Sequence, residues 1–271
     1  MGCSVRAAAL AWHAQGHAAV VVEVQSHQGS VPREAGTRML VAADAVVGTI
    51  GGGHLELRAI ADARELLRAP GGQPPGGVLQ RIALGPSLGQ CCGGAVELRF
   101  TPLNRYELAG WSPPEPLFHL QLYGAGHVGR AIVRLLADIH CHVQWIDERE
   151  AEFPVGPLPP HVERLCVEPV QAEVAAAPPA AFYLVLTHSH DLDLAITQAV
   201  LARGDFAYFG LIGSRTKRAR FEHRLQQRGV PPGLLARMQC PIGVPGIQGK
   251  EPAVIAVAVV AQLLQVAQKL S

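Results

Sequence analysis

The chain has 271 residues, of which 49% are hydrophobic and 17% charged, and its formal net charge is +1. This length allows two domains with separate cores, and the composition is that of a folded globular protein rather than a disordered one. The near-neutral charge gives no indication of a nucleic-acid-binding surface. The six cysteines form no C-x-x-C pair, so the sequence indicates neither a zinc ribbon nor a thioredoxin motif.

We expect a cytoplasmic protein with no membrane contact. The apolar stretch from Ile255 to Val266 contains Gln262 and is shorter than the roughly 20 residues of a membrane span. The first residues lack the basic start, apolar core and cleavage site of a signal peptide. In a reducing compartment the cysteines are expected to be thiols.

The first half of the chain is predicted to mix helices with strands. Helices are expected over 4–15 and 54–68, and strands over 18–24, 37–41, 46–50, 78–84 and 96–100. Gly51, Gly52 and Gly53 follow the third of these strands and precede His54 at the start of a helix. Glycines permit close backbone approach and a helix N-terminus offers free N–H groups, so this turn is a candidate anion cradle. The alternative is a tight turn without a ligand.

Two adjacent cysteines, Cys91 and Cys92, stand between Gly89 and the pair Gly93-Gly94. Neighbouring side chains in an extended segment point in opposite directions, so one thiol could be buried while the other meets a ligand. Nearby glycine N–H groups would lower the pKa of such a thiol. The alternative is that both are small core residues.

A proline-rich stretch separates the two halves. It includes Trp111-Ser-Pro-Pro-Glu-Pro, which is typical of a semi-rigid linker. We therefore predict a first domain over 1–110, a linker over 111–117 and a second domain over 118–271.

The second domain opens on the strand-like run from Phe118 to Tyr123. Gly124-x-Gly126-x-x-Gly129 follows directly and leads into a helical pattern, and the next strand-like run ends in Asp147. This is the dinucleotide-binding fingerprint in its structural context, in which the acid can accept hydrogen bonds from a ribose. The alternative is that the glycines only allow the helix to pack closely on the strand. The sequence thus predicts a Rossmann-like unit.

Further strands are predicted over 162–167, 182–187 and 206–212, in alternation with helices, which indicates a mostly parallel sheet. The strand over 182–187 ends in His188-Ser-His190-Asp191-Leu-Asp193. The spacing of these side chains does not suit a metal site. Ligand contact by the cluster, or capping of the next helix by Asp191, are the two readings that remain.

Gly213-Ser214-Arg215 lies after the strand over 206–212, where another helix is predicted to begin. Ser214 is a candidate N-cap, and Arg215 with Lys217 could contact a phosphate. The alternative is a solvated basic helix face.

Several motifs together resemble the XdhC/CoxI family of xanthine dehydrogenase accessory proteins. They span nearly the whole chain, in this order: Gly29-Ser-Val-Pro-Arg-Glu-Ala-Gly36, Gly48-Thr-Ile-Gly-Gly-Gly-His-Leu-Glu56, Gly89-Gln-Cys-Cys-Gly-Gly94, Tyr123-Gly-Ala-Gly-His-Val-Gly129, Thr187-His188 with Asp191, and Gly210-Leu-Ile-Gly-Ser-Arg215. The first three are more specific than the glycine fingerprint.

The resemblance implies a molybdenum cofactor chaperone without turnover of its own. Such a protein binds the molybdopterin form of the cofactor, holds it while a cysteine desulfurase supplies the terminal sulfur, and delivers it to apo-xanthine dehydrogenase. A homodimer is expected. The candidate cofactor-binding residues are Arg33, Arg38, Gly51, Gly52, Gly53, His54, Cys91, Cys92, Gly124, Gly126, Gly129, Asp147, His188, Asp191, Ser214 and Arg215; no catalytic residue and no metal ligand is assigned.

A second function from a different class uses the fingerprint alone. In that reading the chain is an NAD(P)-dependent oxidoreductase, and only His188 or His190 is a candidate acid or base beside the nicotinamide. This alternative leaves the first domain without a role, whereas the chaperone uses both domains.

Overall fold

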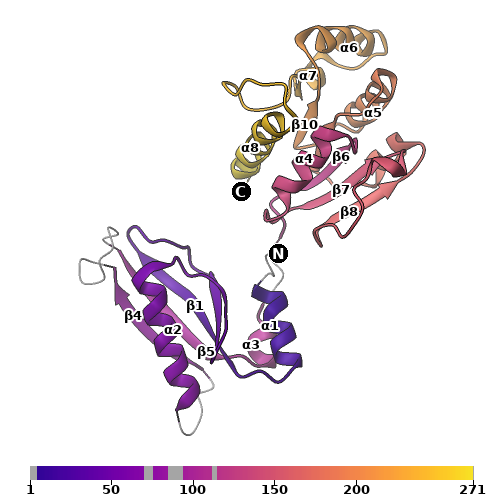
Figure 1. Cartoon of the computed structure of the whole chain (residues 1–271). Helices are drawn as coiled ribbons and strands as arrows, with labels where there is room; N and C mark the ends of the chain where they lie inside the picture. Colours follow the sequence, from indigo (N-terminus) through magenta and orange to yellow (C-terminus); the bar gives the residue numbers. More distant parts are fainter. Residues whose placement is uncertain (1–4, 70–75, 85–93, 112–114, 271) are drawn as a thin grey trace. The chain divides into compact units, whose positions relative to one another are not determined.

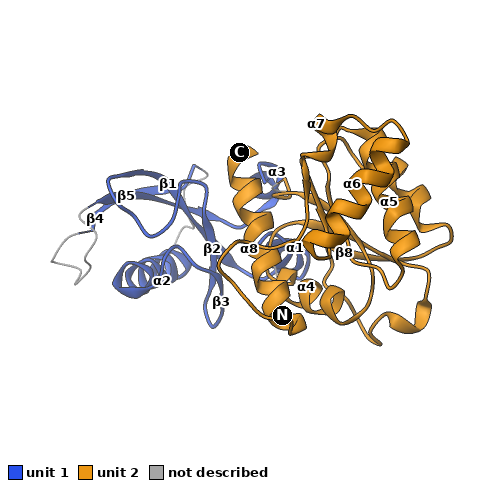
Figure 2. Ribbon diagram, turned by 90° about the horizontal axis from the view of Figure 1, so that it is seen from above, with its two compact units in different colours: residues 1–114 blue, residues 115–271 orange. Residues whose placement is uncertain are grey.

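The computed structural model describes residues 5–69, 76–84, 94–111 and 115–270. The chain forms two compact units, Met1–Pro114 and Glu115–Ser271, which Figure 2 shows in different colours. The chain is mixed α/β, as predicted. Cys91 and Cys92, for which a role was predicted, lie outside the described residues.

The first unit is built on a five-stranded antiparallel sheet with the order β3-β2-β1-β5-β4. Its strands are β1 (Ala19–Gln28), β2 (Arg38–Ala42), β3 (Val46–Gly48), β4 (Val78–Ala83) and β5 (Ala95–Pro102). Its helices are α1 (Val5–Ala14), α2 (Gly53–Arg68) and α3 (Arg105–Ala109). Helix α2 lies along one face of the sheet (Figure 1).

Alternating apolar residues direct α2 onto this sheet. Val20, Val22 and Val24 of β1 point to the same face, as the two-residue period of a strand requires. Leu55 and Ala59 of α2 are fully buried against them. On the opposite face of the sheet, α1 packs against Val21 near the start of β1. The rest of that face is not covered by α1 and is largely polar.

The segment between β5 and the second unit contains a short helix that its proline-rich sequence did not predict. Helix α3 occupies Arg105–Ala109, and Asn104 caps it by accepting hydrogen bonds from Tyr106 N and Glu107 N, both at 2.9 Å. Trp111, placed in the linker by the sequence analysis, is 4% exposed, and its carbonyl accepts from Arg6 Nε at 3.1 Å.

Brief digestion of the full chain with proteinase K should cut first within residues 112–117. Exposed connecting segments are the preferred sites of proteolysis, whereas Trp111 is held by the first unit. Mass spectrometry of the fragments is the measurement, and two stable products that meet in this range are expected. First cuts inside either unit would contradict the predicted linker.

The second unit contains a six-stranded sheet in which every pairing is parallel, with the order β11-β10-β9-β6-β7-β8. The strands are β6 (His119–Tyr123), β7 (His142–Asp147), β8 (Val162–Cys166), β9 (Phe182–Val185), β10 (Tyr208–Leu211) and β11 (Met238–Gln239). The helices are α4 (His127–Leu136), η2 (Glu150–Glu152), η3 (Val170–Ala176), α5 (His190–Arg203), α6 (Arg215–Gln227), α7 (Pro232–Leu235) and α8 (Pro252–Leu270). This is the predicted Rossmann-like architecture; α7 and β11 were not predicted.

Helices cover both faces of this sheet (Figure 1). Helices α4 and α8 pack together on the face formed by Leu122 and Trp145. Helices α5 and α6, with η3, pack on the face that contains Tyr183 and Val185. The strands are therefore buried on both faces, which matches their nearly continuous apolar sequences.

Helix α8 is 19 residues long with a mean hydropathy of 1.8, so by length and composition it could cross a membrane. The sequence analysis expected only a shorter apolar stretch. A core helix of a globular protein meets the same criterion, and Val259 and Leu263 of α8 are fully buried in the second unit.

Candidate functional sites

The strand order places a crevice at the carboxyl end of the parallel sheet. The first two crossovers lead from β6 to β7 and β8, and the chain then returns to the other side of β6 to form β9. In open parallel sheets, ligands bind outside the carboxyl ends of the strands at this reversal. The residues at the ends of three strands pack closely here, with no cavity of water size among them: Tyr123, Gly124, Ile146, Asp147, Glu148, Val170, Thr187, His188 and Leu192.

Two of the three fingerprint glycines are explained by internal packing. A Cβ atom on Gly124 would lie 2.4 Å from the carbonyl oxygen of Leu186, and its φ of +122° also favours glycine. A Cβ atom on Gly129 would lie 2.1 Å from the carbonyl oxygen of Gly124. These glycines allow β6, β9 and α4 to approach one another.

Gly126 differs from both. Its φ of −69° and ψ of −170° are accessible to any residue, and a Cβ atom there would meet nothing within 4 Å. Neither strain nor packing accounts for glycine at this position. Glycine is a favoured residue at a helix N-cap, and in a fingerprint turn it also allows a ligand to approach the backbone closely.

The start of α4 supplies donors at the same place. Gly126 is the N-cap of α4, and no side chain caps it. The first N–H groups of a helix lack intrahelical partners and carry the positive end of the helix dipole. The turn therefore combines an accessible backbone with a preference for anions.

Asp147 lies beside this turn but faces the protein. Its Oδ2 accepts from Ala125 N at 2.7 Å and from Arg149 Nη2 at 3.0 Å. Its Oδ1 accepts from the backbone N and the Nε of Arg149, at 2.9 and 3.0 Å. Both oxygens are thus used to hold the glycine turn and Arg149, and the carboxyl is 5% exposed.

Burial would by itself raise the pKa of Asp147. The side-chain hydrogen bonds from Arg149, the backbone hydrogen bonds from Ala125 and Arg149, and the charge of Arg149 outweigh burial and lower the pKa below its ordinary value. The ionised carboxylate is therefore part of the folded structure at neutral pH.

This lowered pKa predicts an acid-dependent loss of stability. Because the folded pKa lies below the unfolded value of about 3.9, the contribution of Asp147 is full above that value and is lost as pH falls through the folded pKa. Urea midpoints measured from about pH 6 to about pH 3 should fall less steeply for Asp147→Asn than for the parent chain. If the urea midpoints of Asp147→Asn and of the parent chain fell equally with pH, the lowered pKa of Asp147 would be contradicted.

The loop after β9 contains the other crevice residues. His188 is exposed, and its Nε2 lies 3.6 Å from Oε1 of Glu148 across the crevice. Asp191 is exposed in the first turn of α5. The cap of α5 is Ser189, whose hydroxyl accepts from Leu192 N at 3.4 Å, so the predicted alternative of capping by Asp191 is wrong.

A buried ion pair between Asp193 and Lys217 holds the loop after β9 in place. Asp193 is 2% exposed, and its Oδ1 accepts from the backbone N and the hydroxyl of Thr187, at 3.0 and 2.7 Å. Lys217 Nζ donates to Oδ2 of Asp193 and, at 2.8 Å, to the carbonyl oxygen of Ile212. The pair joins the loops that follow β9 and β10, so Lys217 is engaged inside the unit.

Ser214 and Arg215 lie at the start of α6. Ser214 is the N-cap predicted from the sequence, because its hydroxyl accepts from Lys217 N at 3.3 Å. Arg215 is exposed. Unlike the start of α4, the start of α6 is already capped by a side chain.

In the first unit the chain's own carboxylate occupies the glycine turn. Oε2 of Glu56 accepts from Ile50 N at 3.1 Å, from Gly52 N at 3.0 Å and from the Thr49 hydroxyl. The N–H groups of the predicted cradle are therefore partly used by α2 itself. His54 is exposed on the first turn of this helix.

Close glycine contacts bring the three first-unit motifs together. A Cβ atom on Gly51 would lie 2.5 Å from side-chain atoms of Pro32. A Cβ atom on Gly94 would lie 2.5 Å from the carbonyl oxygens of Gln28 and Ser30. The loop after β1 thus contacts both the glycine turn and the last glycine of the cysteine motif.

The two predicted arginines lie in different surroundings. Arg33 is exposed on the loop after β1. Arg38 Nη2 donates to Oε1 of Glu23 at 2.9 Å, and its guanidinium lies 4.8 Å from the ring centroid of Trp111. Arg99 bonds the other oxygen of Glu23, so the charge of Arg38 belongs to a network on the sheet face.

Among the described residues no group of three or more His, Cys, Asp or Glu side chains could hold a metal ion. The free cysteines in those segments are Cys141 and Cys240, which are buried, and Cys166, which is exposed. Burial raises the pKa of Cys141 to about 12, so that thiol is not activated.

Three residues shape these sites in ways that the sequence did not predict, and one of them, Asp193, was part of the predicted ligand-contact cluster. Glu56 was part of a quoted motif, and its position four residues after Gly52 was the available signal, because that spacing returns a helical side chain to the start of its own helix. Arg149 follows Asp147 by two residues, a short separation that permits local pairing. Asp193 offered no comparable signal, because its partner Lys217 is 24 residues away.

The chain therefore combines an antiparallel sheet unit with a Rossmann-like unit in whose fingerprint turn a Cβ atom on Gly126 would meet no protein atom within 4 Å. Residues 120–263 match the family model described as the XdhC Rossmann domain, and residues 12–80 match that of the XdhC and CoxI family. The chain belongs to the XdhC family.

Two known proteins are similar over most of the chain. The uncharacterized protein YqeB of Escherichia coli is 31% identical over 252 residues, which are 91% of this chain and 43% of that protein. The chain thus spans less than half the length of this relative. A solved structure described as a xanthine dehydrogenase from Bacillus halodurans matches with a TM-score of 0.78 and 19% identity, over 99% of this chain and 97% of that one. At this identity the match shows the fold.

Proposed function

We propose that the chain is a chaperone for the molybdenum cofactor. It binds the molybdopterin form, holds it while a cysteine desulfurase supplies the terminal sulfur, and delivers it to apo-xanthine dehydrogenase. Family membership supports an accessory role toward xanthine dehydrogenase. The observation that carries the proposal is the fingerprint turn, where neither packing nor backbone strain requires Gly126 to be glycine and α4 has no side-chain cap.

The chemistry of the cargo fits this turn. Molybdopterin carries a phosphate, and backbone N–H groups at a helix start bind phosphate well. His188 borders the same crevice, and Asp191 and Arg215 are exposed at the starts of the helices that follow β9 and β10. In this proposal Gly126 admits the phosphate, and Gly124, Gly129 and Asp147 hold the turn that presents the N–H groups.

The first unit contains the other candidate binding residues. The motif loops meet near Gly51 and Gly94, where Arg33, Gly52, Gly53 and His54 are accessible at least in part. Cys91 and Cys92 precede Gly94 in the chain, and a thiolate suits the soft metal–sulfur end of the cargo. Arg38 acts here through Glu23, by bracing the sheet face. A cytoplasmic homodimer is part of the proposal.

The alternative, an NAD(P)-dependent oxidoreductase, has less support. Recognition of an adenosine ribose requires an acceptor at the end of the second strand, but both oxygens of Asp147 already accept hydrogen bonds within the unit. NAD(P) binding would require that Asp147 exchange some of these partners. Gel filtration of the protein with NADH and with molybdopterin separates the two functions, because the chaperone should retain only molybdopterin.

The cysteine pair provides a residue-level test. Cys91→Ala and Cys92→Ala should differ, because adjacent side chains in an extended segment point in opposite directions. One variant should lose molybdopterin after gel filtration while its urea midpoint is unchanged. The other should keep the cofactor and lose about 1 kcal/mol or more of stability through a small core void.

Cys166→Ala is the matched control, because this thiol is exposed on β8. It should retain molybdopterin like the parent chain. If both members of the pair also retain it, the thiols are structural and take no part in cargo binding.

A further inference from the structure

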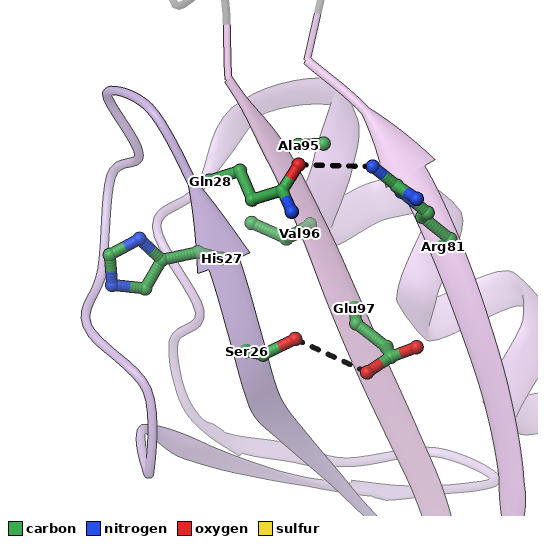
Figure 3. A pocket seen from close by; sticks show the side chains of 7 residues that line it. All are labelled: Ser26, His27, Gln28, Arg81, Ala95, Val96 and Glu97. Carbon is green, nitrogen blue, oxygen red and sulfur yellow. Dashed lines mark hydrogen bonds between the residues drawn. The ribbon is translucent and has the colours of Figure 1, made fainter.

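The polar face of the first-unit sheet contains a pocket of about 200 Å³ near the ends of β1, β4 and β5. Figure 3 shows four of its polar side chains in two hydrogen-bonded pairs, with His27 in neither of them. Arg81 Nη2 donates to Oε1 of Gln28 at 3.1 Å, and the Ser26 hydroxyl donates to Oε2 of Glu97 at 3.2 Å. Ala95 lies beside the first pair and contributes only a methyl group to the lining of the pocket.

The pairing is unusual for this register. Arg81 and Glu97 are direct cross-strand partners on β4 and β5, and opposite charges at such positions ordinarily attract each other. Here each ion is bound instead to a neutral side chain of β1. The Arg81 guanidinium and the Glu97 carboxylate are therefore bound to different side chains around the same pocket.

The separation defines the chemistry of a ligand. Gln28 pairs with Ala95 and Ser26 with Glu97, so the two bonded pairs are two residues apart along β5, about 7 Å. One end offers donors, from Arg81 and the amide of Gln28, and the other offers acceptors. Ionised Glu97 can accept about four hydrogen bonds, and Ser26 uses one of them.

We infer that this pocket binds the 2-amino-4-oxopyrimidine edge of a fused two-ring heterocycle. The exocyclic amine and the adjacent ring N–H donate to Glu97, and the oxo group accepts from Arg81. Pterins and guanine share this edge. The pocket is smaller than the roughly 300 Å³ lower limit of drug-sized sites, so it takes one ring system rather than a whole nucleotide. Its role with a pterin rests on the proposed function, because molybdopterin supplies that edge.

Isothermal titration of the full chain with four probes tests the inference. Pterin is compared with lumazine, and guanosine with inosine, because lumazine has an oxo group in place of the 2-amino group and inosine lacks that group. A pterin site predicts at least tenfold tighter binding of pterin than of lumazine. The same preference for guanosine over inosine, without one for pterin, identifies a guanine site.

Glu97→Gln should weaken the preferred probe at least tenfold and remove the preference for the 2-amino group, since an amide offers fewer acceptors. Glu65→Gln, at an exposed position of α2, is the control and should bind like the parent. Ala95→Leu, which fills the pocket without changing a polar group, is a second variant in case Glu97→Gln does not fold, and it should abolish binding.

The inference is overturned if neither pair of probes is discriminated, or if both folded variants bind like the parent. Its failure is distinguishable from that of the proposed function. A parent chain and a Glu97→Gln variant that retain molybdopterin equally would disprove the pocket and leave the chaperone standing. A parent chain that retains no molybdopterin would disprove the chaperone, while discrimination between the probes would still support the pocket.

Discussion

Replacing Asp193 by Asn should lower the free energy of unfolding of the second unit by about 3–5 kcal/mol, the cost of leaving one member of a buried ion pair alone. The ammonium of Lys217 would keep its bond to the carbonyl oxygen of Ile212 but lose its counter-ion. Thr187 would also lose its charged acceptor, so the loop after β9 would be less firmly held. We therefore expect a loss of stability of the whole second unit and, in addition, greater mobility of the loop after β9.

Urea unfolding measures this effect. Trp12 and Trp111 belong to the first unit, so a chain with both changed to Phe reports the second unit through Trp145. The double variant Asp193→Asn with Lys217→Met should lose less than the single change, because no unpaired ammonium remains.

Glu222→Gln is a matched control for this prediction. It breaks the partly exposed i,i+4 pair of Glu222 with Arg218 on the same helix as Lys217. Such pairs contribute only about 0.3–0.5 kcal/mol. Equal losses for Glu222→Gln and Asp193→Asn would contradict the view that burial of the Asp193 pair decides its strength.

The sequence predicts the architecture well where patterns are local. The strand over Phe118–Tyr123, the glycine turn and the acid at Asp147 occur in the predicted order, because a fingerprint encodes a contiguous strand, turn and helix. The five-residue helix α3 was missed, because the nearby prolines dominate that stretch. Two-residue β11 is also too short to show a hydrophobic period.

The sites were predicted less well than the fold, since composition does not reveal which groups a side chain binds. Asp147 has the position of a ribose acceptor, yet its oxygens face Ala125 and Arg149. The glycines before His54 have the sequence of an anion cradle, yet Glu56 supplies the anion. In both turns a carboxylate of the chain itself accepts hydrogen bonds from backbone N–H groups. Such pairing depends on the folded geometry and cannot be read from the sequence.

The two glycine turns consequently differ in what they offer a ligand. In the first unit Glu56 already accepts from the N–H groups of Ile50 and Gly52. In the second unit Asp147 takes only the N–H of Ala125 from the turn, and the start of α4 has no side-chain cap. This contrast makes the turn around Gly126 the stronger candidate for direct contact with a phosphate.

Gly126→Val should leave the fold intact and reduce molybdopterin retention at least tenfold. A Cβ atom at this position meets no protein atom within 4 Å, and the extended backbone accepts a β-branched residue. The added methyl groups would instead occupy the space through which a ligand reaches the N–H groups at the start of α4. Retained molybdopterin after gel filtration, the urea midpoint and the maturation of xanthine dehydrogenase in cells are the three measurements.

Gly129→Ala is the comparison variant for stability, because its added methyl group meets the protein and not the space above the turn. A Cβ atom on Gly129 would lie 2.1 Å from the carbonyl oxygen of Gly124, so even one methyl group must displace the turn or α4. The free energy of unfolding should fall by about 1–3 kcal/mol for this variant, as for other overpacked sites. Gly126→Val should lose about 1 kcal/mol at most, the cost of a less favoured residue at the N-cap of α4. If Gly126→Val retains molybdopterin and supports maturation like the parent, the turn does not contact the cargo, and Gly126 must be glycine for a reason unrelated to binding.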